Sequence, residues 1–320
     1  MLGGGRSSEH DVSLASAAAV REGLELAGHE PLAVTISRDG HWSVGDEEIQ
    51  LRAAGGLLGC DVVFPALHGP YGEDGVVQGL LECLDVPYVG SDVAASSLCM
   101  DKVRFKELMG AAGMPQVAWA RAGAATTGPE SDGSFSSLGV PVFVKPARLG
   151  SSVGIAKVAS AEELPDALRA ALEHDSLAIV EAAASGIEVE CAVLGNLDAR
   201  ASEPGEILLQ SDWYDYAAKY EPGGMELRVP AGISASARGR VAELALAAFA
   251  HAGCAGLARA DFFVDGETVL LNELNTMPGF TGTSVYAKLW EASGVPYSEL
   301  VDELCQLALE RHRHERSFSA

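Results

Sequence analysis

Hydrophobic positions in the first third of the chain switch between the helical and the strand period. Residues 14–26 and 73–84 repeat apolar side chains on one helical face. Short apolar runs with the length of buried strands lie at 31–36, 62–67 and 87–89. Strands that alternate with helices in this way predict an α/β layer.

The middle of the chain continues the alternation with a less regular order. Ser91 or Asp92 is placed to cap a long helix that continues to about residue 112. Residues 122–139 are rich in Gly, Ser and Thr, which predicts a surface loop without chemistry. Further strands are expected at 142–145, 154–158, 178–181, 188–194 and 206–210, and further helices at 161–172 and 234–251.

The stretch 257–281 carries the strongest polar pattern in the chain. Its β-forming runs 257–264 and 268–274 flank Asp265-Gly266-Glu267, which predicts a hairpin. Because side chains alternate along a strand, Arg259 and Asp261 share one face, and Glu273 and Asn275 share another. With a three-residue loop Arg259 falls opposite Glu273, so that both pairs project to one side.

Oxygen-bearing side chains on this face suit a magnesium ion. Mg²⁺ takes one or two protein carboxylates and keeps substrate phosphates as its other ligands, which fits Asp261, Glu273 and Asn275. Arg259 would then hold anionic substrate or transition-state charge. The alternative is that these polar residues only cover a solvated strand face.

Composition limits the classes of partner. The net charge of −23 argues against a nucleic-acid or anionic-membrane surface, because polyanions would be repelled. The six cysteines contain no C-x-x-C pair, and no apolar run reaches the length of a membrane span. We therefore expect a cytoplasmic protein with reduced thiols, built from two or three domains because 320 residues exceed the usual size of one core.

A glycine-rich segment, Gly150-Ser151-Ser152-Val153-Gly154, lies between strand-like residues. Its glycines and amide hydrogens favour a flap over phosphates. The segment also matches G-x-S-x-G, in which Ser152 would be a hydrolase nucleophile. That motif requires a helix directly after the serine, whereas the residues after Gly154 have a strand pattern.

Other candidate residues are less specific. The P-loop motif is missing from the sequence, and Ser8 breaks the dinucleotide fingerprint after Gly3-Gly4-Gly5. Lys102 and Lys145 are either phosphate-binding charges or solvated surface residues. His68 ends an apolar run, where open α/β sheets bind ligands, but it equally fits a structural donor. Glu9 lies in an equivalent turn.

Two segments are ambiguous in the sequence. Residues 212–220, DWYDYAAKY, concentrate aromatic side chains in a long loop, which is either a lid over substrate or a loop pinned to the surface. The N-terminus offers only Met1 and Leu2 before its glycines. We therefore expect a truncated first strand, and the sequence leaves open whether the true start lies upstream of Met1.

Seven motifs in order resemble the D-alanine–D-alanine ligases, a family of ATP-grasp enzymes, over nearly the whole chain. The resemblance implies an N-terminal parallel α/β domain and a nucleotide held between two mostly antiparallel sheets. It implies domains 1–95, 96–183 with a flap at 148–154, and 184–320 with a loop at 211–229. The motifs are GGRSSEHDVSL, ALHGPYGEDG, MDK, VKPARLGSSVG, YDYAAKY, ARADFF and NELNTMPGFT.

The resemblance also implies an ATP site with two Mg²⁺ or Mn²⁺ ions on Asp261, Glu273 and Asn275. In this family one D-alanine carboxylate attacks the γ-phosphate, and the amine of a second D-alanine displaces phosphate from the acylphosphate. The adenine-side segment 181–184 departs from the family because it lacks the usual lysine and bulky side chains, so backbone groups would supply base contacts. The implied nucleotide contacts are Lys102, Lys145, Glu181, Ala184, Glu188 and Lys219.

The remaining implied roles concern the two amino acids. Glu9 would bind the first D-alanine ammonium and connect through Ser151 to Tyr220, which is typical of enzymes that use D-alanine second. Arg259 and the amide of Gly279 would form an oxyanion hole. The implied contacts to the second substrate and its surroundings are Val12, His68, Ser284 and Val285.

The resemblance therefore implies an ATP-dependent ligase that joins two D-alanines for peptidoglycan precursors, and it implies a homodimer. Two alternatives remain. One is an ATP-grasp ligase with D-lactate or D-serine as second substrate, and the other is a serine hydrolase that uses Ser152.

Overall fold

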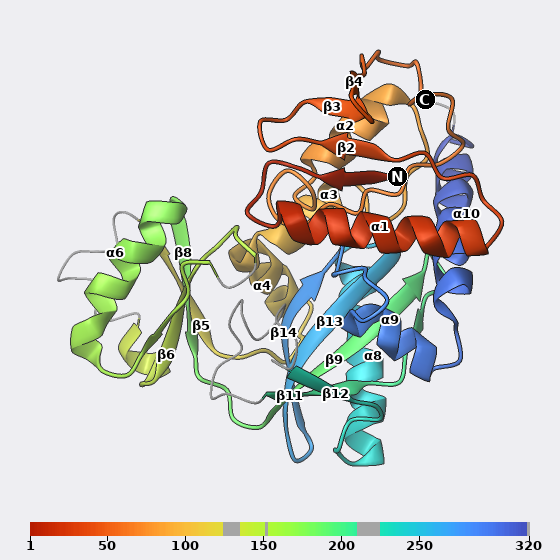
Figure 1. Cartoon of the computed structure of the whole chain (residues 1–320). Helices are drawn as coiled ribbons and strands as arrows, with labels where there is room; N and C mark the ends of the chain where they lie inside the picture. The colour runs from red at the N-terminus through yellow and green to blue at the C-terminus, as the bar shows by residue number, and fades with distance from the viewer. Residues whose placement is uncertain (124–134, 151–152, 210–224, 319–320) are drawn as a thin grey trace.

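Three separate β-sheets organise the part of the chain that the structure describes, and helices pack against each of them (Figure 1). The computed structural model describes residues 1–123, 135–150, 153–209 and 225–318. The expected α/β character is therefore present. Most of the segment expected to be a surface loop, 124–134, lies outside the described residues.

The N-terminal sheet has the strand order β1-β2-β3-β4, with β1 and β2 parallel. The first strand spans Leu2–Gly4, and the side chain of Leu2 is fully buried. Two further runs expected as strands form isolated bridges in this part of the chain, Leu2 with Pro65 and Val63 with Tyr88. The elements are β1 (Leu2–Gly4), α1 (His10–Leu26), β2 (Val34–Ile36), β3 (Trp42–Val44), β4 (Glu47–Glu48) and α2 (Val76–Leu84).

The long helix expected from 92 to 112 is two helices, α3 (Val93–Met100) and α4 (Lys102–Ala111). Each has its own N-cap, because Asp92 accepts a hydrogen bond from the amide of Ala95 and Asp101 accepts one from the amide of Arg104. Asp101 is extended, with ψ 95°, so the helix breaks there. The break places Lys102 in the first turn of α4.

The central sheet is antiparallel, with the order β5-β8-β6-β7, and it stands to one side of the molecule (Figure 1). Helix α6 (Leu164–His174), entered through a 3-10 turn at Ala161–Glu163, packs Leu168 and Ala171 against Val144 and Val180 of this sheet. The strands are β5 (Trp119–Gly123), β6 (Val142–Pro146), β7 (Ala156–Val158) and β8 (Leu177–Ala182).

The C-terminal sheet has the order β12-β11-β9-β13-β14, with β10 paired to β9. Helix α8 covers one face through Val241 and Phe249, while α1, α9 and α10 cover part of the other (Figure 1). The elements are β9 (Ile187–Gly195), β10 (Arg200–Ala201), β11 (Gly205–Leu209), β12 (Met225–Arg228), α8 (Ala235–His251), β13 (Gly256–Asp265), β14 (Thr268–Asn275), α9 (Val285–Ala292) and α10 (Tyr297–Glu315).

One face of the C-terminal sheet changes character along its strands. Leu257 and Leu194 pack in the cluster with α1, α9 and α10. Arg259 and Asp261 follow on the same face of β13, because side chains two apart point the same way. The face is therefore apolar where helices cover it and charged beyond them.

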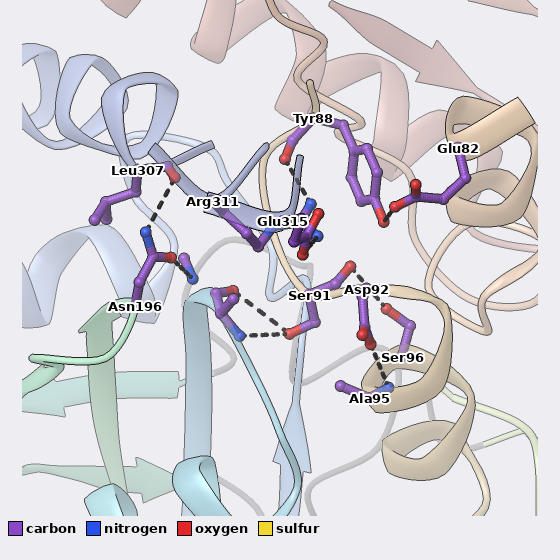
Figure 2. A network of polar contacts seen from close by, with 12 residues as sticks. Glu82, Tyr88, Ser91, Asp92, Ala95, Ser96, Asn196, Leu307, Arg311 and Glu315 are labelled. Atoms are coloured by element: carbon purple, nitrogen blue, oxygen red, sulfur yellow. Dashed lines mark hydrogen bonds and ion pairs between the residues drawn. The ribbon is translucent and has the colours of Figure 1, made fainter. Parts of the chain in front are cut away.

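Polar contacts join the N-terminal elements to the C-terminal sheet and helix α10 (Figure 2). Arg311 donates to the carbonyl of Tyr88 at 3.2 Å, and its guanidinium lies 4.4 Å from the centre of the Tyr88 ring. Ser91 is within 3.3 Å of the amide of Ala255, and Asn196 donates to the carbonyl of Leu307. The contacts of Tyr88 and Ser91 hold the N-terminal elements against α10 and the C-terminal sheet, and the shared apolar cluster packs α1 there.

Within the described residues, none of the helices combines the length and hydrophobicity needed to cross a bilayer.

Candidate active site

Two cavities meet at Glu273, which lines both of them. The first has a volume of about 510 Å³ and lies between the central and C-terminal sheets. The second, about 490 Å³, lies between the N-terminal elements and the C-terminal sheet. The expected residues that line the first cavity are Lys102, Lys145, Glu181, Ala184, Glu188, Asp261 and Glu273. Those that line the second are Glu9, Val12, His68, Arg259, Glu273, Asn275, Gly279, Ser284 and Val285.

The remaining expected residues, Ser151, Lys219 and Tyr220, lie outside the described part of the chain, as does Ser152. The strand β7 follows this segment, as the sequence indicated, rather than the helix that a nucleophile elbow requires.

The hairpin β13–β14 brings the four polar residues together on one face. Asp261 pairs with Glu273 and Arg259 pairs with Asn275. The expected pairing of Arg259 with Glu273 is wrong, because the turn contains two residues and a β-bulge follows Asp261. The expectation that the two faces coincide is nevertheless met.

The guanidinium of Arg259 is held by two carboxylates. Its Nε and Nη2 donate to the two oxygens of Asp261, both at 2.7 Å, and its Nε lies 2.9 Å from Oε2 of Glu190. Arg259 and Asp261 are each 14% exposed, whereas Glu190 is 4% exposed. Such paired, poorly hydrated charges interact strongly, and the guanidinium is fixed at the wall of the second cavity.

The oxygen donors of this face fit Mg²⁺. In the described residues, His, Cys, Asp and Glu side chains form no cluster of three that could bind a metal by themselves. Asp261 and Glu273 instead offer two carboxylates on adjacent strands, with the amide oxygen of Asn275 two residue pairs along on the same face. This donor set leaves coordination positions for phosphate oxygens, as Mg²⁺ sites in nucleotide enzymes do. Glu273 lies 3.2 Å from the ammonium of Lys102, a further contact for a phosphate.

Three charged side chains, two of them buried, lie beside the first cavity. Glu181 contacts Lys145 at 2.5 Å and Lys106 at 2.9 Å, and Lys106 is only 2% exposed. Burial by itself would raise the pKa of Glu181, but the two ammonium groups and their hydrogen bonds outweigh it and lower that pKa to about 2. Sequence analysis missed Lys106, because α4 shows no clear apolar stripe that would mark which residues are buried.

His68 lines the second cavity and forms hydrogen bonds to two other segments of the chain. Its Nδ1 lies 3.1 Å from the carbonyl of Met277, so this nitrogen donates, and its Nε2 accepts from the hydroxyl of Ser16 at 2.8 Å. The same hydroxyl accepts from the amide of Phe280. Burial lowers the pKa of His68, which keeps the ring neutral. Both ring nitrogens of His68 therefore have partners within the protein, as the structural interpretation expects, and its role at the second substrate stays a prediction.

Glu73 is a further carboxyl at the second cavity that sequence analysis did not single out. Its Oε1 accepts from the amide of Gly69 at 2.6 Å. Burial and the nearby Glu9 raise the pKa of Glu73 to about 8. The signal in the sequence was its distance from His68. His68 ends an apolar run, and Glu73 follows it by five residues in the same turn.

Known proteins resemble this chain over nearly its whole length. Family models described as "D-ala D-ala ligase N-terminus" and "D-ala D-ala ligase C-terminus" match residues 1–57 and 50–91, and residues 108–306. A D-alanine–D-alanine ligase of Deinococcus radiodurans is 46% identical, covering 97% of this chain and 98% of the relative. One from Bacillus velezensis is 42% identical, with 98% of each chain covered.

This chain belongs to the D-alanine–D-alanine ligase family.

Solved structures of this family have the same fold. The D-Ala:D-Ser ligase VanG from Enterococcus faecalis superimposes with a TM-score of 0.87 at 34% identity, covering 96% of this chain and 98% of its own. The D-alanine–D-alanine ligase from Coxiella burnetii gives the same TM-score and identity, covering 99% and 94%. The α/β ATP-grasp architecture expected from the sequence is thereby confirmed.

Proposed function

We propose that this protein is an ATP- and Mg²⁺-dependent ligase that joins two D-alanine molecules for the synthesis of peptidoglycan precursors. The observation that carries the proposal is the meeting of the two cavities at Glu273. One cavity offers ammonium groups suited to phosphates, and the other offers a carboxylate, Glu9, and a guanidinium, Arg259, suited to an amino acid. Membership of the D-alanine–D-alanine ligase family supports the same reaction.

The first cavity takes ATP. Lys102 and Lys145 contact its phosphates, Glu181 and Ala184 face the base, and Glu188 binds the ribose hydroxyls; Lys219 belongs to the same proposed set. Mg²⁺ held by Asp261, Glu273 and Asn275 would offset the charge that develops on the transferred phosphoryl group. Support comes from the positions of these residues: apart from Asn275, which lines the second cavity, those that the structure describes all line the first.

The second cavity takes the two amino acids. Glu9 binds the ammonium of the first D-alanine, whose carboxylate oxygen forms a bond to the γ-phosphorus while ADP leaves. The amine of the second D-alanine then attacks the acyl carbon, losing a proton, and phosphate leaves. Arg259 and the amide of Gly279 stabilise the oxyanion of this step. Ser284 binds the second carboxylate, with Val12, His68 and Val285 around it; Ser151 and Tyr220 belong to the same proposed set.

Two proposals about the second substrate compete. The D-Ala:D-Ser ligase VanG shares this fold with a TM-score of 0.87, so D-serine is a specific rival, and D-lactate is the other. The test supplies purified protein with ATP, Mg²⁺ and D-alanine, alone or mixed with D-serine or D-lactate, and identifies the products by mass spectrometry. We expect phosphate release and D-alanyl-D-alanine. Release only in the mixtures would favour a rival, and no release in any of them would overturn the proposal.

A fluorophosphonate labelling experiment separates the ligase from the serine hydrolase alternative. We expect no covalent adduct at Ser152, and labelling without any response to ATP would contradict the ligase proposal.

Several finer properties belong to the same proposal. They are two metal ions per site, with Mn²⁺ able to replace Mg²⁺, a homodimer, a cytoplasmic location, and the domain division at residues 95 and 183. The sequence resemblance supports the metals and the dimer, and the three separate sheets support the division. Metal titration, analytical ultracentrifugation and limited proteolysis test the metals, the dimer and the division in turn.

A further inference from the structure

Three carboxylates lie side by side across the C-terminal sheet. Glu190 on β9 pairs with Asp261 on β13, which pairs in turn with Glu273 on β14. Like charges directly opposite one another destabilise a sheet, so this row requires cations. Arg259 contacts the first two carboxylates and Lys102 contacts the third.

The row runs from buried to accessible. Glu190 is 4% exposed, Asp261 is 14% exposed and Glu273 is 31% exposed. A metal ion that keeps phosphate and water ligands is therefore expected at the accessible end, on Asp261 and Glu273. Glu190, at the buried end, faces the guanidinium of Arg259.

Asp261 has two competing partners in this arrangement. The hydrogen bonds from Nε and Nη2 of Arg259 go to Asp261, in the bidentate geometry that binds a carboxylate most firmly. A metal ion bound to Asp261 withdraws negative charge from the two oxygens that Arg259 contacts, which weakens these charge-assisted hydrogen bonds. The Nε of Arg259 is already 2.9 Å from Glu190, so a second carboxylate is in place to hold the guanidinium.

We propose that Glu190 is a positioning residue that holds the guanidinium of Arg259 and thereby frees Asp261 to bind the metal ion. This inference rests on the metal assignment in the proposed function. It separates two roles that otherwise fall on one residue, because Asp261 would have to orient Arg259 and coordinate the metal together. A purely structural Glu190 would only compensate the buried charge of Arg259.

The test measures Mn²⁺ affinity in the presence of ADP, using the electron paramagnetic resonance signal of free Mn²⁺, so that no turnover is needed. Glu190→Gln keeps the shape of the side chain and removes its charge. We expect Mn²⁺ affinity to fall about 10- to 100-fold, as is typical when a group that orients a metal ligand is lost. Unchanged affinity in a folded variant would overturn the inference.

A matched control is Glu303→Gln. Glu303 forms a bidentate pair with Arg200 at 2.5 and 2.7 Å and lines neither cavity. Its loss should leave Mn²⁺ affinity unchanged. If the wild-type protein binds no Mn²⁺ with ADP, the metal assignment fails, and this inference fails with it. If the wild-type protein binds Mn²⁺ and Glu190→Gln does not alter the affinity, only the inference is overturned.

A second pair of variants shows whether Glu190 acts through Arg259. In an Arg259→Met background Asp261 has lost its competing guanidinium, so adding Glu190→Gln should change Mn²⁺ affinity by less than about twofold. An undiminished loss in that background would contradict the proposed route. If Glu190→Gln fails to fold, Glu190→Asp, which keeps the charge but shortens the reach, should weaken Mn²⁺ binding in the same direction, and wild-type affinity would overturn the inference.

Discussion

Asp261 lies directly opposite Glu273 because one extra residue, Asn272, is inserted into β14 as a β-bulge. Regular alternation from Leu271 would pair Glu273 with Ala260 instead, on the face that packs in the cluster with α8. The bulge reverses the alternation once, so that Glu273 reaches the cavity while Leu274 stays in the core. Both the donor set for the metal and the packing under it depend on this irregularity.

Glu273→Gln should abolish turnover and spare the fold. The substitution removes one of the two carboxylate charges available to the metal, yet the side chain is 31% exposed, so its loss should change unfolding free energy by only about 0.5 kcal/mol. Phosphate release and thermal unfolding measure the two effects. Glu267→Gln, in the turn of the same hairpin and bonded to Ser234, is the control and should stay active. An active Glu273→Gln enzyme would refute the metal assignment.

Ser16→Ala should slow catalysis through the segment that contains Gly279. The hydroxyl of Ser16 donates to His68 and accepts from Phe280, so its loss leaves two buried groups without that partner, at about 1–3 kcal/mol. Displacement of the Gly279 amide should lower kcat on the order of 10- to 100-fold. Steady-state kinetics and urea unfolding give both values.

Ser13→Ala is the matched control for Ser16→Ala. Ser13 lies one turn earlier on α1 and bonds the amide of Gly4 and the carbonyl of Ala66. We expect a similar loss of stability with kcat near the wild-type value. An equal fall of kcat in both variants would mean that general loosening of α1, not the Ser16 contact, controls the rate.

Glu73→Gln should remove part of the pH dependence of stability. The pKa of Glu73 is raised to about 8 from 4.5, so the folded protein keeps a proton that the unfolded chain loses between these values. Stability from this group is therefore lost as pH rises from 4.5 to about 8. Melting temperatures at about pH 5 and pH 8.5 should differ less in the variant than in the wild type. Glu47→Gln, on the exposed strand β4, is the control and should leave this difference unchanged. If Glu73→Gln also left it unchanged, the carboxyl of Glu73 would not titrate in this range.

Local patterns in the sequence predicted the strands of the β13–β14 hairpin and the face that its polar residues share. The register could be predicted only from the spacing of the apolar residues in the second strand. Val269 and Leu271 are two residues apart, which keeps them on one face, whereas Leu271 and Leu274 are three apart. An apolar series that changes parity within a strand indicates a bulge. The break at Asp101 was likewise readable, since Asp101 is a second N-cap candidate inside the predicted helix.

Contacts between distant segments were not readable from the sequence. His68 and Phe280 lie 52 and 264 positions away from Ser16, whose hydroxyl joins them, and no local period relates the three residues. The sequence predicted that Glu190 lies in a strand. Its contact with Arg259 could not be predicted, because it depends on the pairing of β9 with β13. Such charges become visible only when the sheet order is known.

Lys106→Met should destabilise the protein although it replaces a charge by an apolar side chain of similar length. Lys106 and Glu181 are 2% and 4% exposed, and breaking a buried pair costs about 3–5 kcal/mol. We expect the lower value because Lys145 remains with Glu181.

The lowered pKa of Glu181, about 2 against 4.5, contributes stability that is present above pH 4.5 and is lost as pH falls toward 2. Without Lys106 that pKa rises, so the deficit should be largest at neutral pH and smaller at about pH 4. Urea unfolding at both values measures it, with Lys157→Met on the exposed side of β7 as a control that should shift stability by no more than about 0.5 kcal/mol. Equal neutral-pH stability of Lys106→Met and wild type would show that Lys145 alone balances the buried carboxylate.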